Sequence, residues 1–553
     1  MQRKLLIPVL VAGVAVASVG AGIASSGDQA FTSVPSAAVK AAGYAPSSIL
    51  SPELRQQIVA VGSVRLENPQ GIVTHYGYEN DLPSADDPTV PQMTATPALA
   101  AEAQKTEPDK NTYLVLKGQT GADPNYNYGT HFLYQGHEVG AKINGSATNR
   151  QGYITRINLD ADDAHCVTLM ATQDSSGAPI QGIDGSTWDP FAQRLLFTTE
   201  NTGAPTYAAT PSVPSVVRDV SGALGRGGYE GIQNDGDGNI WIVEDIGGST
   251  KPGTVAKQPN SFIYRYVPAS PGDLQHGTLQ VLQVLNDLGS PITFESQAAL
   301  DAPDQVALHS YGKTFNTKWI TIHNTATDGN APFVANPLAK AAHATPFKRP
   351  ENGVFRPGTK FREFYFTETG DTNATSVENS SPVAGGWGSI FKLIQTSPSA
   401  QTGKISVFFQ SNQAHSGLDN IQFVSKNQLL SVEDAGDTLH TQRKALDSGY
   451  EFDVTADYSS GGDPVRFLAE GRDFAAMLDS AFAGYVKNEG DNEITGMHVS
   501  NGDPTTDGIL GAATPRFGAG AWRMFYTQQH GENRTWEITH ASASDQGDEQ
   551  GDN

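Results

Sequence analysis

A short apolar or alternating segment recurs along the chain, each time after a turn rich in Gly, Asp, Asn or Pro and before a polar cluster. Runs of this length and pattern predict β-strands. The main instances are HFLYQGHE (131–138), QRLLFTTENTG (193–203), GNIWIVEDIGG (238–248), KWITIHN (318–324), REFYFTETGD (362–371), NQLLSVEDAGD (427–437) and WRMFYTQQHGE (522–532). Further strands are expected in GYITRINLD (152–160), SFIYRYVP (261–268) and GSIFKLIQ (388–395).

Long helical periodicity is nearly absent. The best helix candidate is 474–485, and the next is 51–61. Repetition of one strand-containing unit predicts an all-β fold and favours a β-propeller, for which we expect six blades and few short helices. The spacing from Glu138 to Glu200 is 62 residues and that from Glu200 to Glu244 is 44. Because a simple blade takes about 40–45 residues, insertions between blades are expected.

Acidic residues stand where these strands end. They are His137-Glu138, Glu200-Asn201, Glu244-Asp245, Glu368 and Glu433-Asp434. If the strand ends converge on one channel, the carboxylates repel one another unless cations neutralise them, and Ca²⁺ takes six to eight oxygen ligands of this kind. The alternative is that each acid caps a turn in solvent.

The N-terminus has the features of an export signal. Arg3 and Lys4 precede an apolar run that ends near Ala24, and small residues follow. An uncleaved anchor is the alternative, because about 20 apolar residues can span a bilayer. We therefore expect a signal peptide at 1–24, a low-complexity extension at 25–110, the propeller at 111–540 and a disordered acidic tail at 541–553. The mature protein is expected to be secreted or periplasmic, monomeric and without stable membrane association.

The composition and the missing motifs exclude several classes of binding partner and of functional site. The 553 residues carry a formal net charge of −23, which argues against nucleic acid as a partner. The one cysteine, Cys166, excludes an intramolecular disulfide framework and any Cys-rich metal site. No nucleophile elbow, phosphate-binding loop or dinucleotide fingerprint is present, and DGDGN (235–239) lacks the glycine that an EF-hand loop requires.

Several ordered segments resemble the PhoX-type alkaline phosphatases, secreted bacterial phosphatases with a β-propeller fold. The matching segments are GHE (136–138), LLFTTEN (195–201), GRGGYEG (225–231) with IWIVED (240–245), RPE (349–351), LDNIQF (418–423) with LLSVED (429–434), NEITGMHV (492–499) and YTQQHGE (526–532). Together they cover about 130–535, most of the mature chain.

The resemblance implies a set of site residues. The best candidate metal ligands are Glu200, Glu230, Glu351, Glu433 and Glu493, and weaker ones are Glu138, Glu244, Asp419 and Asp434. Arg349 is the candidate phosphate clamp, because a guanidinium fork suits bidentate phosphate, and a structural ion pair is the alternative. Glu351 belongs to the candidate catalytic set with Arg349.

Two departures bear on the metal. The family's iron-binding members use a cysteine in a segment that reads GIDGSTWDP (182–190) here, and Gly136 replaces the family's Asn. Loss of the thiolate argues against iron and leaves an all-oxygen ligand set, which suits Ca²⁺ or Mg²⁺. Calcium is therefore the expected cofactor.

The expected function is hydrolysis of small phosphate monoesters, in which metals activate a water or bridging oxygen for in-line attack. One alternative is a calcium-dependent lactonase or esterase propeller using Asn420, Asn201 and His137 or His530. Another is a non-catalytic secreted propeller in which calcium is structural.

Overall fold

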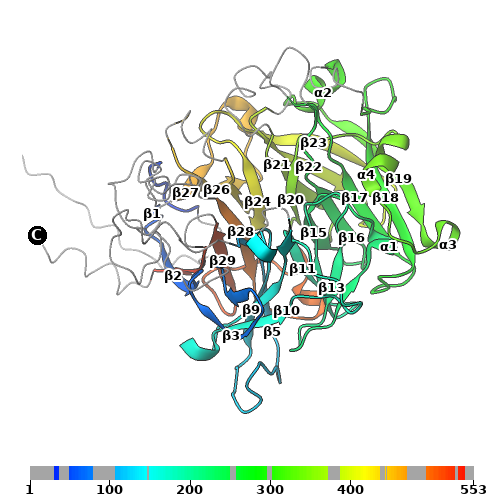
Figure 1. The fold of residues 1–553 in the computed structure, drawn as a ribbon. Helices are drawn as coiled ribbons and strands as arrows, with labels where there is room; N and C mark the ends of the chain where they lie inside the picture. The colour runs from blue at the N-terminus through cyan, green and yellow to red at the C-terminus, as the bar shows by residue number, and fades with distance from the viewer. Residues whose placement is uncertain are drawn as a thin grey trace, which may run out of the picture.

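The computed structural model describes residues 30–36, 49–78, 106–145, 149–249, 257–294, 302–370, 386–435, 443, 445–469, 493–529 and 533–541. This part of the chain folds into antiparallel sheets arranged around a common centre (Figure 1). The innermost strand of each sheet contacts the innermost strands of its two neighbours, in the circular order β5, β11, β15, β20, β24 and β28, with β28 returning to β5. The prediction of an all-β, six-bladed propeller is confirmed.

The blades follow one another along the chain. The first contains β5 (Pro108–Val115), β6 (His131–His137), β9 (Ile154–Asn158) and β10 (Val167–Ala171). The second contains β11 (Ser186–Asp189), β12 (Arg194–Phe197), β13 (Tyr207–Ala209) and β14 (Val217–Asp219). The third contains β15 (Tyr229–Asn234), β16 (Ile240–Glu244), β17 (Ile263–Pro268), β18 (Gly277–Leu285) and β19 (Phe315–Asn324). The fourth contains β20 (Pro350–Phe355), β21 (Glu363–Glu368), β22 (Ser389–Gln395) and β23 (Thr402–Gln410).

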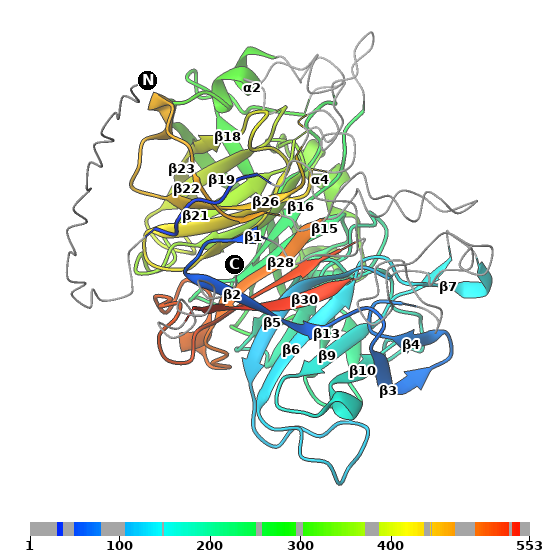
Figure 2. The ribbon, with the colours of Figure 1, turned by 90° about the vertical axis from the view of Figure 1, so that its left-hand side faces the viewer.

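The last two blades recruit strands from the N-terminal part of the chain. The fifth joins β24 (Leu418–Phe423), β25 (Gln428–Glu433), β26 (Ser448–Asp453) and β27 (Val465–Ala469) to β1 (Ile49–Leu50). The sixth joins β28 (Ile494–Ser500), β29 (Arg523–Gln528) and β30 (Arg534–His540) to β2 (Leu54–Ala60), which lies against β30 in Figure 2. The described residues within 25–110 thus supply β1, β2 and the start of β5 to the blades, and β2 pairs with β30 from the C-terminal part of the chain.

Smaller elements decorate the blades. Two-stranded ribbons are formed by β3 (Arg65–Gln70) with β4 (Val73–His75) and by β7 (Ala141–Lys142) with β8 (Arg150–Gln151). The α-helices are α1 (Ser221–Leu224), α2 (Pro303–Leu308), α3 (Thr325–Asp328) and α4 (Ala335–Ala341). The 3₁₀ turns are Ile143–Gly145, Asp163–His165, Tyr458–Ser460 and Thr506–Gly508. Among the described residues, none of the helices has the length and apolar character needed to cross a membrane.

The apolar runs in the sequence are strands buried on both faces. On β16, Ile240 and Ile242 pack toward the second blade, whereas Trp241 and Val243 pack toward the fourth. Comparable clusters fill the other interfaces between neighbouring blades. This two-sided burial explains why β16 reads as a continuous apolar run, as strands covered on both faces do.

Every strand expected from the pattern is present, and the recurring segments are mainly the second strands of the blades: β6, β12, β16, β21, β25 and β29. The expected helix at 51–61 is wrong. That segment is β2, because its backbone completes the sixth blade, and tertiary pairing overrides local pattern. The expected helix at 474–485 lies outside the described residues.

Candidate metal centre

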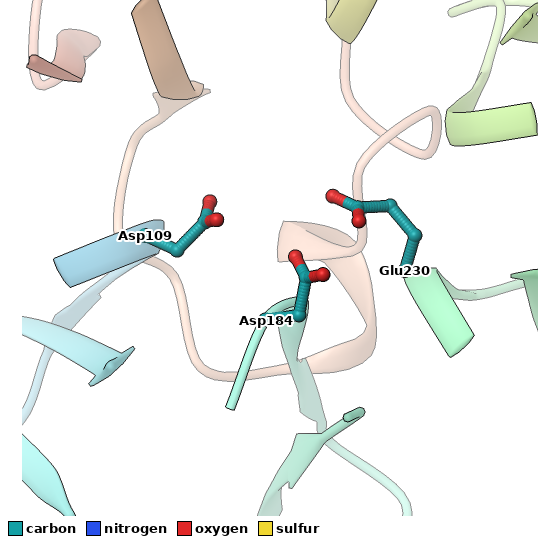
Figure 3. A group of neighbouring side chains, drawn as sticks. All are labelled: Asp109, Asp184 and Glu230. Carbon is teal, nitrogen blue, oxygen red and sulfur yellow. The ribbon is translucent and has the colours of Figure 1, made fainter. Parts of the chain in front are cut away.

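One end of the propeller channel is lined by acidic residues from the start of the innermost strands. Asp109, Glu230, Glu351 and Asp419 are each the second residue of β5, β15, β20 and β24, and Asp184 stands two residues before β11. We call these five residues the inner carboxylates. All five side chains are buried. Figure 3 shows three of them directed toward a shared space: Asp109 from β5, Glu230 from β15 and Asp184 from the segment that precedes β11.

A β-bulge turns four of these acids into the channel. In β15, Glu230 and Gly231 together oppose the single residue Val243 of β16, since Tyr229 pairs with Glu244 and Ile232 with Ile242. The same two-against-one register places a bulge at Asp109-Lys110, at Glu351-Asn352 and at Asp419-Asn420. A bulge re-aims the side chains of its residues and increases local twist. The four blades therefore use one backbone device to present an acid.

The second bulge position differs among blades. Gly231 approaches blade four so closely that a Cβ there would lie 2.9 Å from the backbone of both Glu351 and Asn352. Asn352 donates to Glu230 at 3.1 Å, and Asn420 donates to both oxygens of Asp419 at 2.9 and 2.8 Å. In the first blade this position holds Lys110. The amides thus hold neighbouring carboxylates in place across the channel.

The inner carboxylates fall into two overlapping groups. Ligand oxygens of Asp109, Asp184 and Glu230 lie within 4.8 Å of one another, as do those of Glu230, Glu351 and Asp419. Glu230 belongs to both. Burial, and then the charge of Asp419, raise the pKa of Asp109 to about 8. Burial also raises the pKa of Asp184 and of Glu230 well above the ordinary values, and neighbouring carboxylates add to both shifts.

This arrangement suits cations that prefer oxygen ligands. Five carboxylates at such distances repel one another in the absence of positive charge. Asp184 also has an oxygen, Oδ1, that is buried and makes no hydrogen bond with any described residue. Buried polar atoms are rarely left without a partner, and a bound ion is one recognised reason for an apparent exception. With no thiolate and no imidazole in either group, the donor set suits Ca²⁺ or Mg²⁺.

Two basic side chains reach the inner carboxylates. Lys110 is buried, and its Nζ donates to Oδ1 of Asn420 at 2.6 Å and to the carbonyl oxygen of Met497 at 3.1 Å. Arg349 stands at the start of blade four, where Nε donates to both oxygens of Asp245 at 3.0 Å and Nη2 donates to Oδ2 at 2.6 Å. Nη2 of Arg349 also lies 3.5 Å from Glu351.

The structure brings some predicted site residues together. Glu230, Glu351 and Asp419 are inner carboxylates, and Arg349 lies beside them. Glu200 follows β12, and burial followed by the charges of Glu138 and Asp245 raises its pKa well above the ordinary value. Glu200 and Glu138 therefore lie within electrostatic reach of the inner carboxylates, as Asp434 does of Arg349. Glu493 directly precedes β28 in the sixth blade.

Glu244 and Glu433 are among the predicted ligands that lie outside both groups. Glu244 and Glu433, together with Glu368, end the second strand of their blades, and we call these three the strand-end carboxylates. Each pairs with the residue just before an inner carboxylate, namely Tyr229, Leu418 and Pro350. In this register their side chains bind protein donors.

The strand-end carboxylates are fully buried and accept bonds from backbone amides. Glu433 accepts from the Ser416 and Ser448 amides, both at 2.9 Å, and from Nη1 of Arg443 at 2.7 Å. Glu244 accepts from the Phe262 amide at 3.0 Å, from the Tyr264 hydroxyl at 3.1 Å and from the Asn336 amide at 3.0 Å. Glu368 accepts from the Lys348 amide at 2.8 Å and contacts His309 at 3.0 Å. These bonds tie loops to strand ends.

The sequence analysis did not single out three residues of the centre: Asp109, Asp184 and Lys110. Asp184 lies inside 182–190, a segment that was compared only for its missing cysteine. Asp109 and Lys110 lie in the range assigned to an extension. The signal that could have found them is an acid at the start of a polar strand, as in Tyr229-Glu230 and Leu418-Asp419.

The described residues of the lactonase alternative make contacts with other protein groups. His137 is buried, contacts the Thr155 hydroxyl at 3.0 Å and stacks on Tyr153, and burial lowers its pKa to about 3. Asn201 is exposed, and the oxygen of Asn420 accepts from Lys110. His530 lies outside the described residues.

Comparison with known proteins finds a similar fold among solved structures. No curated protein sequence matches the chain. Among solved structures, PhoX of Pseudomonas fluorescens in complex with vanadate, a transition-state analogue, is similar in fold, with a TM-score of 0.54, 12% identity, and coverage of 92% of this chain and 98% of that one. A gluconolactonase from Xanthomonas campestris matches with a TM-score of only 0.26 and 12% identity, over 68% of this chain and 89% of the other.

A family model matches a long continuous region. The model of the alkaline phosphatase PhoX family matches residues 223–500, half of the chain, a region that includes Glu230, Glu351, Asp419 and Arg349. The chain therefore belongs to the PhoX alkaline phosphatase family.

Proposed function

We propose that this protein is an exported, calcium-dependent phosphatase that hydrolyses small phosphate monoesters. Membership of the PhoX family supports a phosphatase. The observation that carries the metal dependence is the convergence of five buried carboxylates, from five blades, with an arginine beside them.

Asp109, Asp184, Glu230, Glu351 and Asp419 would hold the cations. Bound divalent ions would supply the positive charge that neutralises the phosphate and polarises its oxygens. The chain as a whole has a net charge of −23 and repels a phosphate dianion, so a locally positive site is required.

Arg349 would orient the phosphate. Asp245 holds the guanidinium through Nε and Nη2, and no described residue accepts a hydrogen bond from Nη1. About a fifth of the Arg349 side chain, 21%, is exposed, whereas that of Asp245 is 2% exposed. A guanidinium fixed on one edge and open on the other can donate to a phosphate oxygen without first being ordered, and this lowers the entropy cost of binding.

Export remains a prediction, because residues 1–24 lie outside the described part of the chain. N-terminal sequencing of the protein recovered outside the cytoplasm tests it. We expect a new N-terminus close to Ala24, and an intact Met1 on a membrane-bound protein would contradict the proposal.

The test of activity is hydrolysis of p-nitrophenyl phosphate by EDTA-treated protein, with Ca²⁺, Mg²⁺ or Fe³⁺ returned separately. We expect Ca²⁺ to restore turnover. Asp184→Asn should reduce kcat/KM by at least about 100-fold, the upper end of the effect of removing partners of metal ligands. Asp287→Asn is the matched control, because that side chain is 73% exposed on the surface. A folded, Ca²⁺-binding protein with no turnover on any phosphate ester would indicate a structural role for the ions.

A further inference from the structure

Lys110 places a buried side-chain ammonium group beside the inner carboxylates. It occupies the second bulge position of blade one, where blades four and five have Asn352 and Asn420. Its side chain is buried, and its Nζ donates to Oδ1 of Asn420 and to the Met497 carbonyl oxygen, which belong to blades five and six. One ammonium thus bridges three blades at the channel axis.

The oxygens that bind this ammonium are of the kind that bind calcium. Ca²⁺ in proteins is held by carboxylates together with amide and backbone carbonyl oxygens. Asn420 is oriented for such a role, because its Nδ2 donates to Asp419 and to the Thr495 hydroxyl at 3.1 Å, which leaves Oδ1 directed at the Lys110 ammonium. Asp419 supplies a carboxylate beside these oxygens.

The position of Lys110 is fixed by its neighbours. Its own carbonyl oxygen accepts from the Ser186 hydroxyl at 3.1 Å, and the next residue, Asn111, donates to the Gly496 carbonyl at 2.7 Å. The Lys110 carbonyl and the Asn111 side chain therefore tie this segment to blades two and six. Burial lowers the pKa of Lys110, whereas the charges of Asp419, Asp109, Glu230 and Asp184 favour its protonated form.

We propose that Lys110 takes the place of one divalent cation, and so limits the number of Ca²⁺ ions that the inner carboxylates bind. This inference rests on the proposed function, since it assumes a cation-binding centre. The ammonium satisfies Asn420 and Met497 and offsets part of the charge of the carboxylates. A calcium ion on the same oxygens would have to displace it.

The test is the number of Ca²⁺ ions bound per chain at equilibrium, measured by flow dialysis, for the wild type and for Lys110→Met, which keeps an unbranched side chain and removes the ammonium group and its charge. We expect Lys110→Met to bind one Ca²⁺ more than the wild type. Lys110→Arg should bind the wild-type number, and so should Lys313→Met, a matched change at a half-exposed lysine on the surface. Equal numbers and affinities for Lys110→Met and the wild type would overturn the proposal.

Stability provides a second readout. Without calcium, Lys110→Met leaves the inner carboxylates uncompensated, so its Tm should be lower than that of the wild type and should rise more steeply with Ca²⁺ concentration. Lys110→Gln should behave in the same way. If neither neutral variant folds at any Ca²⁺ concentration, the ammonium is not replaceable by calcium and the proposal fails. Failure of the proposed function is a separate result, a wild type that binds Ca²⁺ and hydrolyses no phosphate ester.

Discussion

Two sets of buried carboxylates stand side by side in the strand pairings at one end of the propeller. The strand-end carboxylates, Glu244, Glu368 and Glu433, accept hydrogen bonds from protein donors. The inner carboxylates also accept hydrogen bonds, as Glu230 does from Asn352, but their ligand oxygens lie within 4.8 Å of one another in two groups. Each set has an oxygen without a hydrogen-bond partner among the described residues, Glu244 Oε1 in one and Asp184 Oδ1 in the other. Both sets are buried, so the close approach of the inner carboxylates to one another, and not burial, is what suits them to hold a cation.

The largest effect on the free energy of unfolding is expected from Glu433→Gln, which tests the role of the strand-end carboxylates. Glu433 faces two backbone amides and Arg443, so the amide group of Gln would place a donor against a donor and leave Asp447 as the remaining carboxylate partner of the buried guanidinium among the described residues. Breaking a buried ion pair costs about 3–5 kcal/mol, and we expect a value near the lower end. Denaturant unfolding measures it. A loss below about 1 kcal/mol would show that the bonds to Glu433 contribute little.

The second prediction concerns how the stability of the calcium-free protein depends on pH, which distinguishes the inner carboxylates from the strand-end carboxylates. Burial and Asp419 raise the pKa of Asp109 from 3.8 to about 8, so the folded state binds more protons than the unfolded state between these values. The stability of the calcium-free protein should therefore be highest near pH 4 on this account and fall as pH rises toward 8, by about 1.4 kcal/mol per pH unit for each extra proton bound.

Saturating Ca²⁺ should remove most of this slope, because it stabilises the ionised inner carboxylates. A smaller dependence of stability on pH should remain with Ca²⁺ bound, because burial raises the pKa of Glu244 to about 8 and the partners of Glu244 are protein donors. Tm measured from pH 5 to pH 8 with and without Ca²⁺ checks this. The same slope under both conditions would mean that the ion does not bind the inner carboxylates.

Glu230→Gln should have the opposite effect to Glu433→Gln on stability. Glu230 belongs to both inner groups, so neutralising it removes repulsion from Asp184 and Glu351. We expect the calcium-free variant to be more stable than the wild type by about 1 kcal/mol, the value of a shift of one pKa unit, and to bind Ca²⁺ more weakly. If the calcium-free variant is less stable than the wild type, Glu230 acts as the strand-end carboxylates do, by accepting hydrogen bonds that stabilise the fold.

The smallest effect is expected from Asp245→Asn, which loosens Arg349 without removing an inner carboxylate. KM for p-nitrophenyl phosphate and the inhibition constant for inorganic phosphate should rise by about fivefold, or roughly 1 kcal/mol, while the amount of bound Ca²⁺ stays the same. Asp219→Asn is the matched control, because Asp219 pairs with Arg226 at 2.9 Å and ends β14 of the second blade, whereas Asp245 follows β16 of the third. Equal effects of the two substitutions would exclude a positioning role for Asp245.

The sequence predicted the second strands well and the innermost strands poorly. Second strands such as β16 carry apolar side chains on both faces because blades cover both, and this pattern is visible without a structure. Innermost strands such as β15 (YEGIQN) and β24 (LDNIQF) line a polar channel and carry bulges, so neither alternation nor an apolar run marks them. Strand β2 was mistaken for a helix because its strand partner is β30, at the other end of the chain.

The same difference explains what could be predicted of the site. Acids at the ends of second strands were recognised from their position, but position does not reveal whether a side chain meets an amide or another acid. Glu433 and Glu230 therefore entered one list of candidate ligands, although the structure gives Glu433 three protein donors and places Glu230 between other carboxylates. Asp109 and Asp184 were missed because no apolar run precedes them.

The central claim is that cations bind the inner carboxylates and not the strand-end carboxylates. The most direct test is anomalous diffraction from crystals of the protein soaked in Mn²⁺ or Tb³⁺, which report the positions of bound cations. The account predicts anomalous peaks between Asp109, Asp184 and Glu230 or between Glu230, Glu351 and Asp419, and none beside Glu244 or Glu433. An empty inner centre, or a peak at Glu433, would contradict it.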